Sequence, residues 1–316
     1  MVNIIKNICC KTKNKCTFAL PKTLPKHTQI MSFILDGRAL SNQLKESMRD
    51  KVQTLFFQNG RRPTLTVVLV GNNPDSQIYV RSKIKACEAI GLEGRLMEFD
   101  ESISETELLH IIYKLNEDPE VDAILVQLPL PEHICEQTII EAIVREKDVD
   151  GFHPLNVVSL WQGEKCIVPC TPKGIMRLLK EAKLDLAGKR AVVVGRGNIV
   201  GKPTAALLLR ENATVTITHT FTQNLKNYTL SADVLLVAVG RKHLITADMV
   251  KPGAIVIDVG LYRDEQGKVW GGVDFEHVKE VSSYITPVPG GVGPMTIAML
   301  MENTIECYIH NINKQH

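Results

Sequence analysis

The sequence predicts an α/β protein built from two units, the second of them a Rossmann-like dinucleotide-binding domain. From Ile34 onward, short apolar segments rich in β-branched residues alternate with stretches of helical periodicity, which is typical of parallel sheets covered on both faces. A strand pattern, a glycine turn and a helix pattern follow one another near the middle of the chain. With 316 residues, the chain is long enough for two domains with cores of their own.

The first unit begins with a helical pattern, because Leu40, Leu44, Met48, Val52 and Leu55 recur at helical spacing. We then expect strands at Thr64–Val70, Arg95–Phe99 and Val121–Leu128, and helices at Gln77–Ile90, Glu105–Asn116 and Leu130–Arg145. A turn at Gly71–Ser76 separates the first strand from the helix that follows it.

The second unit follows a linker near His153–Pro169 and a helix at Gly174–Ala182. Strands are expected at Ala191–Val194, Thr214–Thr218, Val234–Val239 and Ala254–Val259. A loop dense in Pro and Gly, Thr286–Pro294, precedes a long helix from Met295 to about Ile309. A terminal helix of this kind often packs back on the first domain, which would place the Pro/Gly loop in the cleft.

The glycine turn lies within Ala191–Pro203, which reads AVVVGRGNIVGKP. Glycine admits positive φ and lets a phosphate approach the backbone, while a helix N-terminus offers free N–H groups and a partial positive charge. The context therefore predicts a pyrophosphate site at Gly195, Gly197 and Gly201. The G-x-G-x-x-x-G spacing is one residue longer than the usual fingerprint, and the alternative is a tight turn that binds nothing.

The end of the next strand bears on the choice of cofactor. It reads Thr218-His219-Thr220, without the acid that commonly binds a ribose 2′-hydroxyl. Because an acid there would repel a 2′-phosphate, its absence favours NADP, and Arg196 can pair with that phosphate. The alternative is that Arg196 is a solvated turn residue.

Composition excludes several classes of protein. The net charge of +2 argues against nucleic acid as the main partner, and no apolar run reaches the roughly 18 residues of a membrane helix. The eight cysteines are scattered, and Cys166 and Cys170 lack the second pair of a zinc site, so no metal site is predicted. This use of cysteine fits a reducing, cytoplasmic compartment.

Residues 1–31 contain lysines but no acidic residue, and they show no clear periodicity. We expect a disordered extension, or translation that starts at Met31. The alternative is organelle targeting, since targeting segments are also poor in acid. Such segments are rich in Arg and Ser, however, and neither residue occurs here.

Tyr79 and Lys83 are four residues apart on a predicted helix, so their side chains share one face. A lysine in a partly desolvated cleft can serve as an acid or base, and a tyrosine can orient a flat substrate. The alternative is a solvated surface helix. A Tyr-x-x-x-Lys pair also occurs in short-chain dehydrogenases, but there it follows the glycine turn, whereas here it precedes it.

Two further polar residues follow apolar segments. Gln127 ends a predicted strand, where a parallel sheet binds ligands, and it can hydrogen-bond the lysine amine. Asp150, in DVDGF, stands at the boundary between the units and can accept from the N–H groups of a heterocycle. The alternatives are a solvent-facing glutamine and an ordinary Asp-Gly turn.

Together these segments resemble the family of bifunctional methylenetetrahydrofolate dehydrogenases/methenyltetrahydrofolate cyclohydrolases. The matching stretches are YVRSKIKACEAIG, ILVQLPLP, DVDGFHPLN, PCTPKG, GRGNIVGKP, AIVIDVG and ITPVPGGVGPMT. They occur in the family's order from about Ile34 to Ile309, and the QLPLP and PGGVGP segments are the most specific.

The resemblance implies two α/β domains flanking a cleft. Residues 32–152 would form a folate-binding catalytic domain, on which helix 294–312 packs back, and residues 153–293 an NADP-binding Rossmann-like domain. The implied enzyme oxidises 5,10-methylenetetrahydrofolate to 5,10-methenyltetrahydrofolate with NADP and hydrolyses the product to 10-formyltetrahydrofolate. Tetrahydrofolate derivatives are then the substrates, and a homodimer is the assembly that the family suggests.

The resemblance also implies roles for single residues. Lys83 would be the acid/base of the hydrolytic step, and Gln127 would orient it. Tyr79 would position the pterin side of the substrate, and Asp150 would bind the pterin ring. Pro289, Gly290 and Gly291 would line the folate site, while Gly195, Arg196, Gly197, Thr220 and Leu261 would contact the cofactor.

Three positions depart from the family pattern. Gly197 stands where Ser is common, Thr220 where Ser or Arg is usual, and Phe221 in place of a frequent basic residue. Gly197 and Phe221 remove potential ligands of a 2′-phosphate, whereas the hydroxyl of Thr220 and the side chain of Arg196 remain, so NAD is a possible cofactor beside NADP. The rival functions are another two-domain NAD(P)-dependent dehydrogenase and a non-catalytic nucleotide-binding protein.

Overall fold

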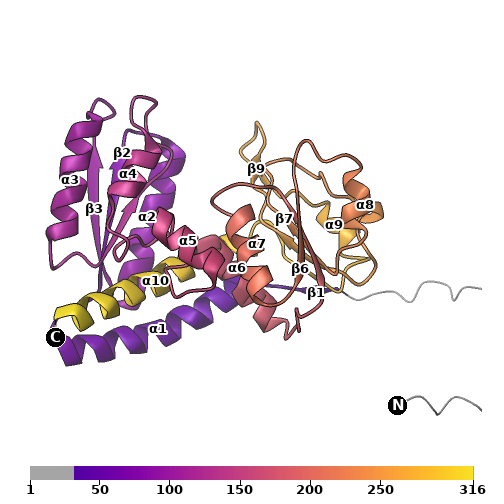
Figure 1. Cartoon of the computed structure of the whole chain (residues 1–316), viewed down its shortest axis with the longest axis horizontal. Coiled ribbons are helices and arrows are strands. Elements are labelled where there is room, and N and C mark those ends of the chain that lie inside the picture. The colour runs from indigo at the N-terminus through magenta and orange to yellow at the C-terminus, as the bar shows by residue number, and fades with distance from the viewer. Residues whose placement is uncertain (1–31, 316) are drawn as a thin grey trace, which may run out of the picture.

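The computed structural model describes residues 32–315, and the expectations for residues 1–31 lie outside this part of the chain. The chain forms two α/β lobes, which Figure 1 shows side by side. One lobe holds a three-stranded sheet and the other a six-stranded sheet, and the strands of both sheets run parallel. The predicted α/β fold with two units is thus confirmed.

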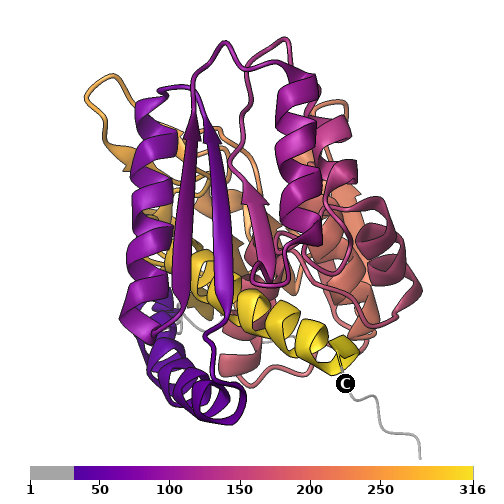
Figure 2. The same cartoon turned by 90° about the vertical axis from the view of Figure 1, so that its left-hand side faces the viewer.

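The sheet of the first lobe has the order β3-β2-β4. Its strands are β2 (Thr64–Val70), β3 (Glu93–Phe99) and β4 (Ala123–Val126), and its main helices are α1 (Gly37–Asn59), α2 (Pro74–Ile90) and α3 (Glu105–Glu117). Alternate residues of β2 belong to different cores, Val67 to the one that includes α2 and Val68 to the one that includes α3. The two helices therefore cover opposite faces of the sheet, as Figure 2 shows.

The second lobe contains a Rossmann-like sheet in the order β1-β11-β8-β7-β5-β6. Its strands are β1 (Phe33–Ile34), β5 (Arg190–Val194), β6 (Thr214–Thr218), β7 (Val234–Val237), β8 (Ile255–Asp258) and β11 (Tyr284–Ile285). Around it lie α6 (Cys170–Glu181), α7 (Gly201–Arg210), α8 (Leu225–Thr229), η1 (Ala247–Met249) and α9 (Phe275–Val278). The chain passes from β5 to β6 on one side and then to β7 on the other, so the crevice that binds ligands is expected between β5 and β7.

Two features of the second lobe had no signal in the sequence. The strand β1 precedes the first lobe in the chain, yet it pairs with β11, and Phe33 stacks on Tyr284 with 5.4 Å between the ring centroids. A short hairpin of β9 (Tyr262–Arg263) and β10 (Val269–Trp270) extends from the lobe. Strands of two residues are too short to show periodicity.

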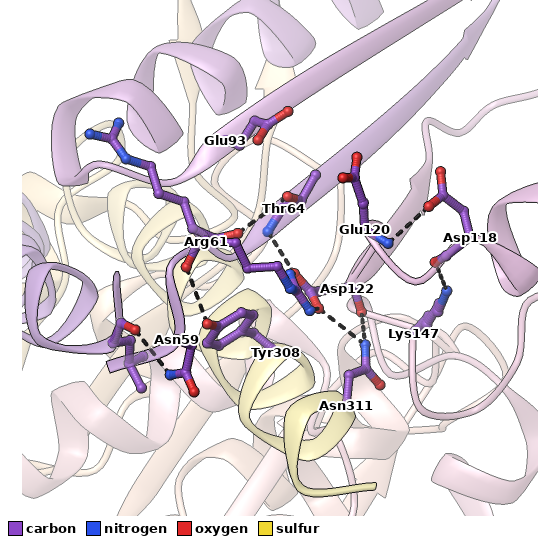
Figure 3. Close-up of polar contacts among 12 residues, drawn as sticks. Asn59, Arg61, Thr64, Glu93, Asp118, Glu120, Asp122, Lys147, Tyr308 and Asn311 are labelled. Atoms are coloured by element: carbon purple, nitrogen blue, oxygen red, sulfur yellow. Dashed lines mark hydrogen bonds and ion pairs between the residues drawn. The ribbon is translucent and has the colours of Figure 1, made fainter. Parts of the chain in front are cut away.

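The C-terminal helix α10 (Val292–Gln315) runs beside α1 and also contacts α6 and α2 (Figures 1 and 2). Its last turns are held by the buried carboxylate of Asp122, which accepts from both terminal nitrogens of Arg61 at 2.7 and 2.8 Å (Figure 3). Asn311 of α10 donates to the Asp122 carbonyl oxygen at 3.3 Å, and Arg61 lies 4.6 Å over the Tyr308 ring. The helix therefore packs against the first lobe.

Two predicted segments differ from the structure. The helix expected at Leu130–Arg145 shortens to α4 (Glu136–Ala142), because Pro129 and Pro131 cannot donate to a helical ladder and Asn116 bonds the chain on both sides of Ile143. The expected linker at His153–Pro169 contains the helix α5 (Pro154–Gln162). Its signals were present, since Pro154 opens the first turn and Gly163 ends the helix at φ +76°.

Candidate active site

Helix α2 carries Tyr79 and Lys83, and both of its ends are fixed. The Asn73 side chain accepts from Ser76 N–H at 3.1 Å, Pro74 opens the first turn, and Gly91 closes the last one at φ +83°. Lys83 is half-buried, while the Tyr79 side chain is exposed one turn earlier. The helix thus presents the lysine inward and the tyrosine toward solvent.

Lys83 meets Gln127 at the end of β4. The Nζ atom of Lys83 donates to Oε1 of Gln127 at 2.9 Å, while Nε2 of Gln127 donates to the carbonyl oxygen of Leu128 at 2.6 Å. Because the amide nitrogen is already bound to that carbonyl, the amide oxygen faces the lysine. The predicted hydrogen bond between these two side chains is present.

Lys83, Gln127 and Asp150 line one cavity of about 220 Å³. Its other walls come from Val126, Leu128 and Phe152 and, across the lobes, from Cys170, Thr171, Ile199 and Thr296. Burial raises the pKa of Asp150, and the nearby Lys83 ammonium opposes this rise. The cavity therefore combines an amine, a carboxyl and an amide between the two lobes.

A turn fixes the position of Asp150. The buried Asp148 carboxylate accepts from the backbone N–H groups of Gly151 at 3.1 Å and His153 at 2.8 Å, and from Asn156 Nδ2 at 2.9 Å. Gly151 adopts φ +71°, and a Cβ there would lie 2.6 Å from the Ile167 carbonyl oxygen. The Asp-Gly sequence thus forms a turn, which is the alternative that the sequence analysis gives for it. The same turn positions Asp150 at the cavity.

The structure does not place every predicted residue at the cavity wall. Tyr79 and the Pro289–Gly291 segment are not among its lining residues. Gly290 has φ +111°, and its carbonyl oxygen accepts from Arg38 N–H at 3.0 Å, so this loop contacts the start of α1. Thr296, on the first turns of α10, lines the cavity instead and lies 2.9 Å from the Thr171 hydroxyl.

The glycine turn lies between β5 and α7, at the carboxyl edge of the second sheet. Gly195 has φ +115°, and a Cβ there would lie 2.4 Å from the Ala238 carbonyl oxygen; a Cβ at Gly201 would lie 2.3 Å from that of Gly195. Gly197 is different, because a Cβ there would meet nothing within 4 Å. The turn therefore requires two of the three glycines, and it leaves open space beside Gly197.

The other predicted cofactor residues lie at the same edge of the sheet. Thr220 is exposed just after β6, and Leu261, which is 52% exposed, follows β8. The Arg196 guanidinium lies 5.9 Å from the Phe221 ring centroid. An arginine, a hydroxyl and the backbone of the glycine turn thus surround the place where a dinucleotide binds in this fold.

Asp258, at the end of β8, is a buried residue that the sequence reasoning missed. Its carboxylate accepts from the N–H groups of Gly260, Gly272 and Val273 at 2.9, 3.1 and 2.9 Å, yet burial raises its pKa to about 6. It connects β8 to the segment after the β9–β10 hairpin. Its signal was an acid at the end of an apolar strand, AIVIDV.

Two family models match the chain. The catalytic domain of tetrahydrofolate dehydrogenase/cyclohydrolase matches residues 35–150, and the NAD(P)-binding domain of the same family matches residues 169–312. The chain belongs to the tetrahydrofolate dehydrogenase/cyclohydrolase family. Both the suspected resemblance and the Rossmann-like character of the second lobe are thereby confirmed.

Similar named proteins and solved structures support the same family assignment. The Bifunctional protein FolD of Streptococcus agalactiae is 53% identical over 283 residues, which cover 90% of this chain and all of the relative. The crystal structure of the bifunctional enzyme FolD from Campylobacter jejuni matches with a TM-score of 0.87 and 52% identity, over 88% of this chain and 99% of the other. The Trypanosoma brucei FolD, solved with NADP and an inhibitor, matches with a TM-score of 0.85 and 37% identity, over 89% of this chain and 98% of the other.

Residues 32–315 contain neither a membrane-spanning helix nor a group of side chains arranged to bind a metal ion. No helix there is long and apolar enough to cross a membrane. Over the same residues, no group of three or more His, Cys, Asp and Glu side chains is arranged to hold a metal ion.

Proposed function

We propose that this chain oxidises 5,10-methylenetetrahydrofolate with NADP and hydrolyses the resulting 5,10-methenyltetrahydrofolate to 10-formyltetrahydrofolate in the same cavity. Membership of the family supports both activities. The observation that carries the proposal is the Lys83–Gln127 hydrogen bond in a cavity that Asp150 also lines. In this proposal Lys83 is the proton carrier, Gln127 orients it, and Asp150 supplies a carboxyl between a folate lobe and a dinucleotide lobe.

Lys83 is the proposed acid/base of the hydrolytic step. Water adds to the methenyl carbon and loses a proton, after which a ring nitrogen must gain a proton before its bond to that carbon breaks. An amine held beside the reacting carbon can carry this proton, which typically contributes about 10²- to 10⁴-fold to the rate. Gln127 keeps the amine in place without adding a charge, because its oxygen accepts from Nζ at 2.9 Å.

Asp150 is the proposed anchor of the pterin ring. A carboxyl can accept from the ring N–H and exocyclic amine of such a heterocycle, and it lies in the same cavity as Lys83. Tyr79 is proposed to position the pterin side of the substrate from the mouth of the cavity. Pro289, Gly290 and Gly291 are proposed to line the folate site from the second lobe.

The residues of the second lobe fit a dinucleotide. The turn is packed so tightly that neither Gly195 nor Gly201 has room for a Cβ, Gly197 faces open space, and the ten-residue helix α7 starts beside it. When bound, NADP⁺ supplies the acceptor for the hydride. Arg196 and Thr220 are proposed to bind the 2′-phosphate, Gly197 to leave room for it, and Leu261 to contact the cofactor.

The division of the chain into domains, its assembly and its location are also part of the proposal. We propose residues 32–152 as the folate-binding domain, with helix 294–312 packed on it, and residues 153–293 as the NADP-binding domain. The contacts of α10 with α1 support the first assignment. A homodimer and a cytoplasmic location are proposed from the family and from the use of cysteine.

Initial rates test the proposed function. The purified chain is given 5,10-methylenetetrahydrofolate with NADP⁺ or NAD⁺, and reduced cofactor and methenyl product are followed separately. We expect reduced cofactor to form, with NADP⁺ preferred, and little methenyl product to accumulate. Binding of cofactor without turnover would instead favour a non-catalytic nucleotide-binding protein, and turnover of an amino acid but no folate another dehydrogenase.

A further inference from the structure

Helix α10 contacts the Asp150 turn through Asn303, a residue within the segment matched by the NAD(P)-binding family model. The side chain is fully buried. Its Nδ2 donates to the carbonyl oxygens of Val149 and Val168, each at 2.9 Å, and its Oδ1 accepts from Lys173 Nζ at 2.8 Å. A buried amide with both of its ends bonded in this way has a fixed orientation.

The two carbonyl groups belong to segments on either side of α5. Val149 immediately precedes Asp150 in the first lobe, and Val168 lies two residues before the start of α6 in the second. The Asn303 amide therefore joins the Asp150 turn to the entry of the second lobe. The close approach of Gly151 to the Ile167 carbonyl oxygen leaves this junction no room for an added Cβ.

The Cys170 thiol adds a second connection between Asn303 and Asp150. Its Sγ atom lies 3.5 Å from Asn303 Nδ2 and 3.8 Å from Oδ1 of Asp150. Asn303 thus reaches the carboxyl both through the backbone of Val149 and through this sulfur. Asn303 itself does not line the cavity, so any effect on a ligand there passes through other residues.

We propose that Asn303 is a positioning residue for the folate site, which holds the Asp150 carboxyl in place from the C-terminal helix. The inference rests on the proposed role of Asp150 in binding the pterin ring. A carboxyl that accepts hydrogen bonds from a flat heterocycle must be placed accurately, because an error of 1 Å in a site can cost about 10²-fold in rate. A helix that follows the dinucleotide-binding lobe therefore completes the folate site of the other lobe.

A double-mutant cycle with Asp150→Asn tests this role. Asn303→Leu keeps the number and branching of the side-chain heavy atoms but removes both donors, and we expect the KM for 5,10-methylenetetrahydrofolate to rise about tenfold or more. The Kd for NADP⁺ should stay within about twofold of wild type, since Asn303 does not contact the glycine turn. Once Asp150 is already Asn, Asn303→Leu should add less than about twofold to the KM, because residues that act through one another are not additive.

Asn311→Leu is the matched control, because Asn311 is on the same helix and bonds the first lobe at Asp122, away from the cavity. It should lower the melting temperature but leave the KM unchanged. If Asn303→Leu does not fold, Asn303→Ser, which retains one donor, replaces it in the same cycle.

The inference would be overturned by any one of three results. These are additive effects in the cycle, an equal rise in KM for Asn311→Leu, or an equal loss of NADP⁺ affinity. A wild-type KM for Asp150→Asn would overturn the proposed role of Asp150, a separate failure.

Discussion

The ammonium group of Lys83 and the amide oxygen of Gln127 are 2.9 Å apart, although 44 residues separate them in the chain. One residue comes from the middle of α2 and the other from the end of β4, so the fold of the first lobe creates the pair. The hydrogen-bond partner of Lys83 is a neutral amide, which positions the nitrogen without adding a charge. A carboxylate in its place would favour the ammonium form.

Gln127→Glu tests the need for a neutral partner. The introduced carboxylate would stabilise the ammonium form of Lys83, so we expect the cyclohydrolase kcat near neutral pH to fall about 10²-fold. Binding of NADP⁺ should not change, because Gln127 lies in the first lobe. Gln137→Glu, on the exposed face of α4, is the control; a Gln127→Glu enzyme as active as this control would contradict the proposed function of the pair.

Arg196 and Gly197 together test the choice of cofactor. A hydrogen bond to a charged group contributes about 1.5–3 kcal/mol, so Arg196→Ala should lower the ratio of kcat/KM for NADP⁺ to that for NAD⁺ by about 10- to 100-fold. Gly197→Ser should raise this ratio, because the open space beside Gly197 accepts a side chain that can bond a phosphate. An unchanged ratio in both variants would mean that the 2′-phosphate is bound elsewhere.

Asp258 gives a prediction for the pH dependence of stability. Its pKa in the folded chain is about 6, above its ordinary value, so the folded state binds the proton more tightly than the unfolded state. The stability that Asp258 contributes is therefore fully present only below the ordinary pKa of an aspartate, about 4, and it is lost as the pH rises through about 6, by about 3 kcal/mol in all. The amide side chain of the Asp258→Asn variant does not titrate in this range, so the variant lacks this dependence of stability on pH.

Denaturation of wild type and Asp258→Asn at several pH values measures this effect. The difference in the free energy of unfolding should move in favour of the variant by about 2 kcal/mol between pH 4 and pH 7. The buried Asp148 and Asp150 titrate in both proteins, so their contributions cancel in the difference. A difference that is constant over this range would refute the raised pKa.

Much of the fold could be predicted from local pattern. The strand β2 was predicted with its observed bounds, Thr64–Val70, since its apolar run ends at a turn sequence. The glycine turn was predicted from its strand and helix, and the structure shows why Gly195 and Gly201 are required. The strand β1 could not be predicted, because two residues carry no period and their partner, β11, lies 251 positions later.

Some residues of the candidate site could likewise be predicted from the sequence, and others could not. Lys83, Gln127 and Asp150 could be predicted because each stands at a recognisable place in a motif, and the fold brings all three to one cavity. Asn303 could not, since its two carbonyl partners lie 154 and 135 residues away. A buried asparagine in an apolar helix looks the same in sequence whether its partner is a distant turn or its own helix.

The substitution Lys83→Met is the most direct test of the central claim that one amine carries the proton of the hydrolytic step. It keeps an unbranched, flexible side chain that is one atom shorter and removes the proton carrier, so cyclohydrolase activity should fall by at least ~10²-fold. Hydrolysis of methenyltetrahydrofolate by the variant and by wild type is measured in parallel, with NADP⁺ binding as the control for folding. A variant that binds NADP⁺ normally and hydrolyses the methenyl compound at the wild-type rate would contradict the claim.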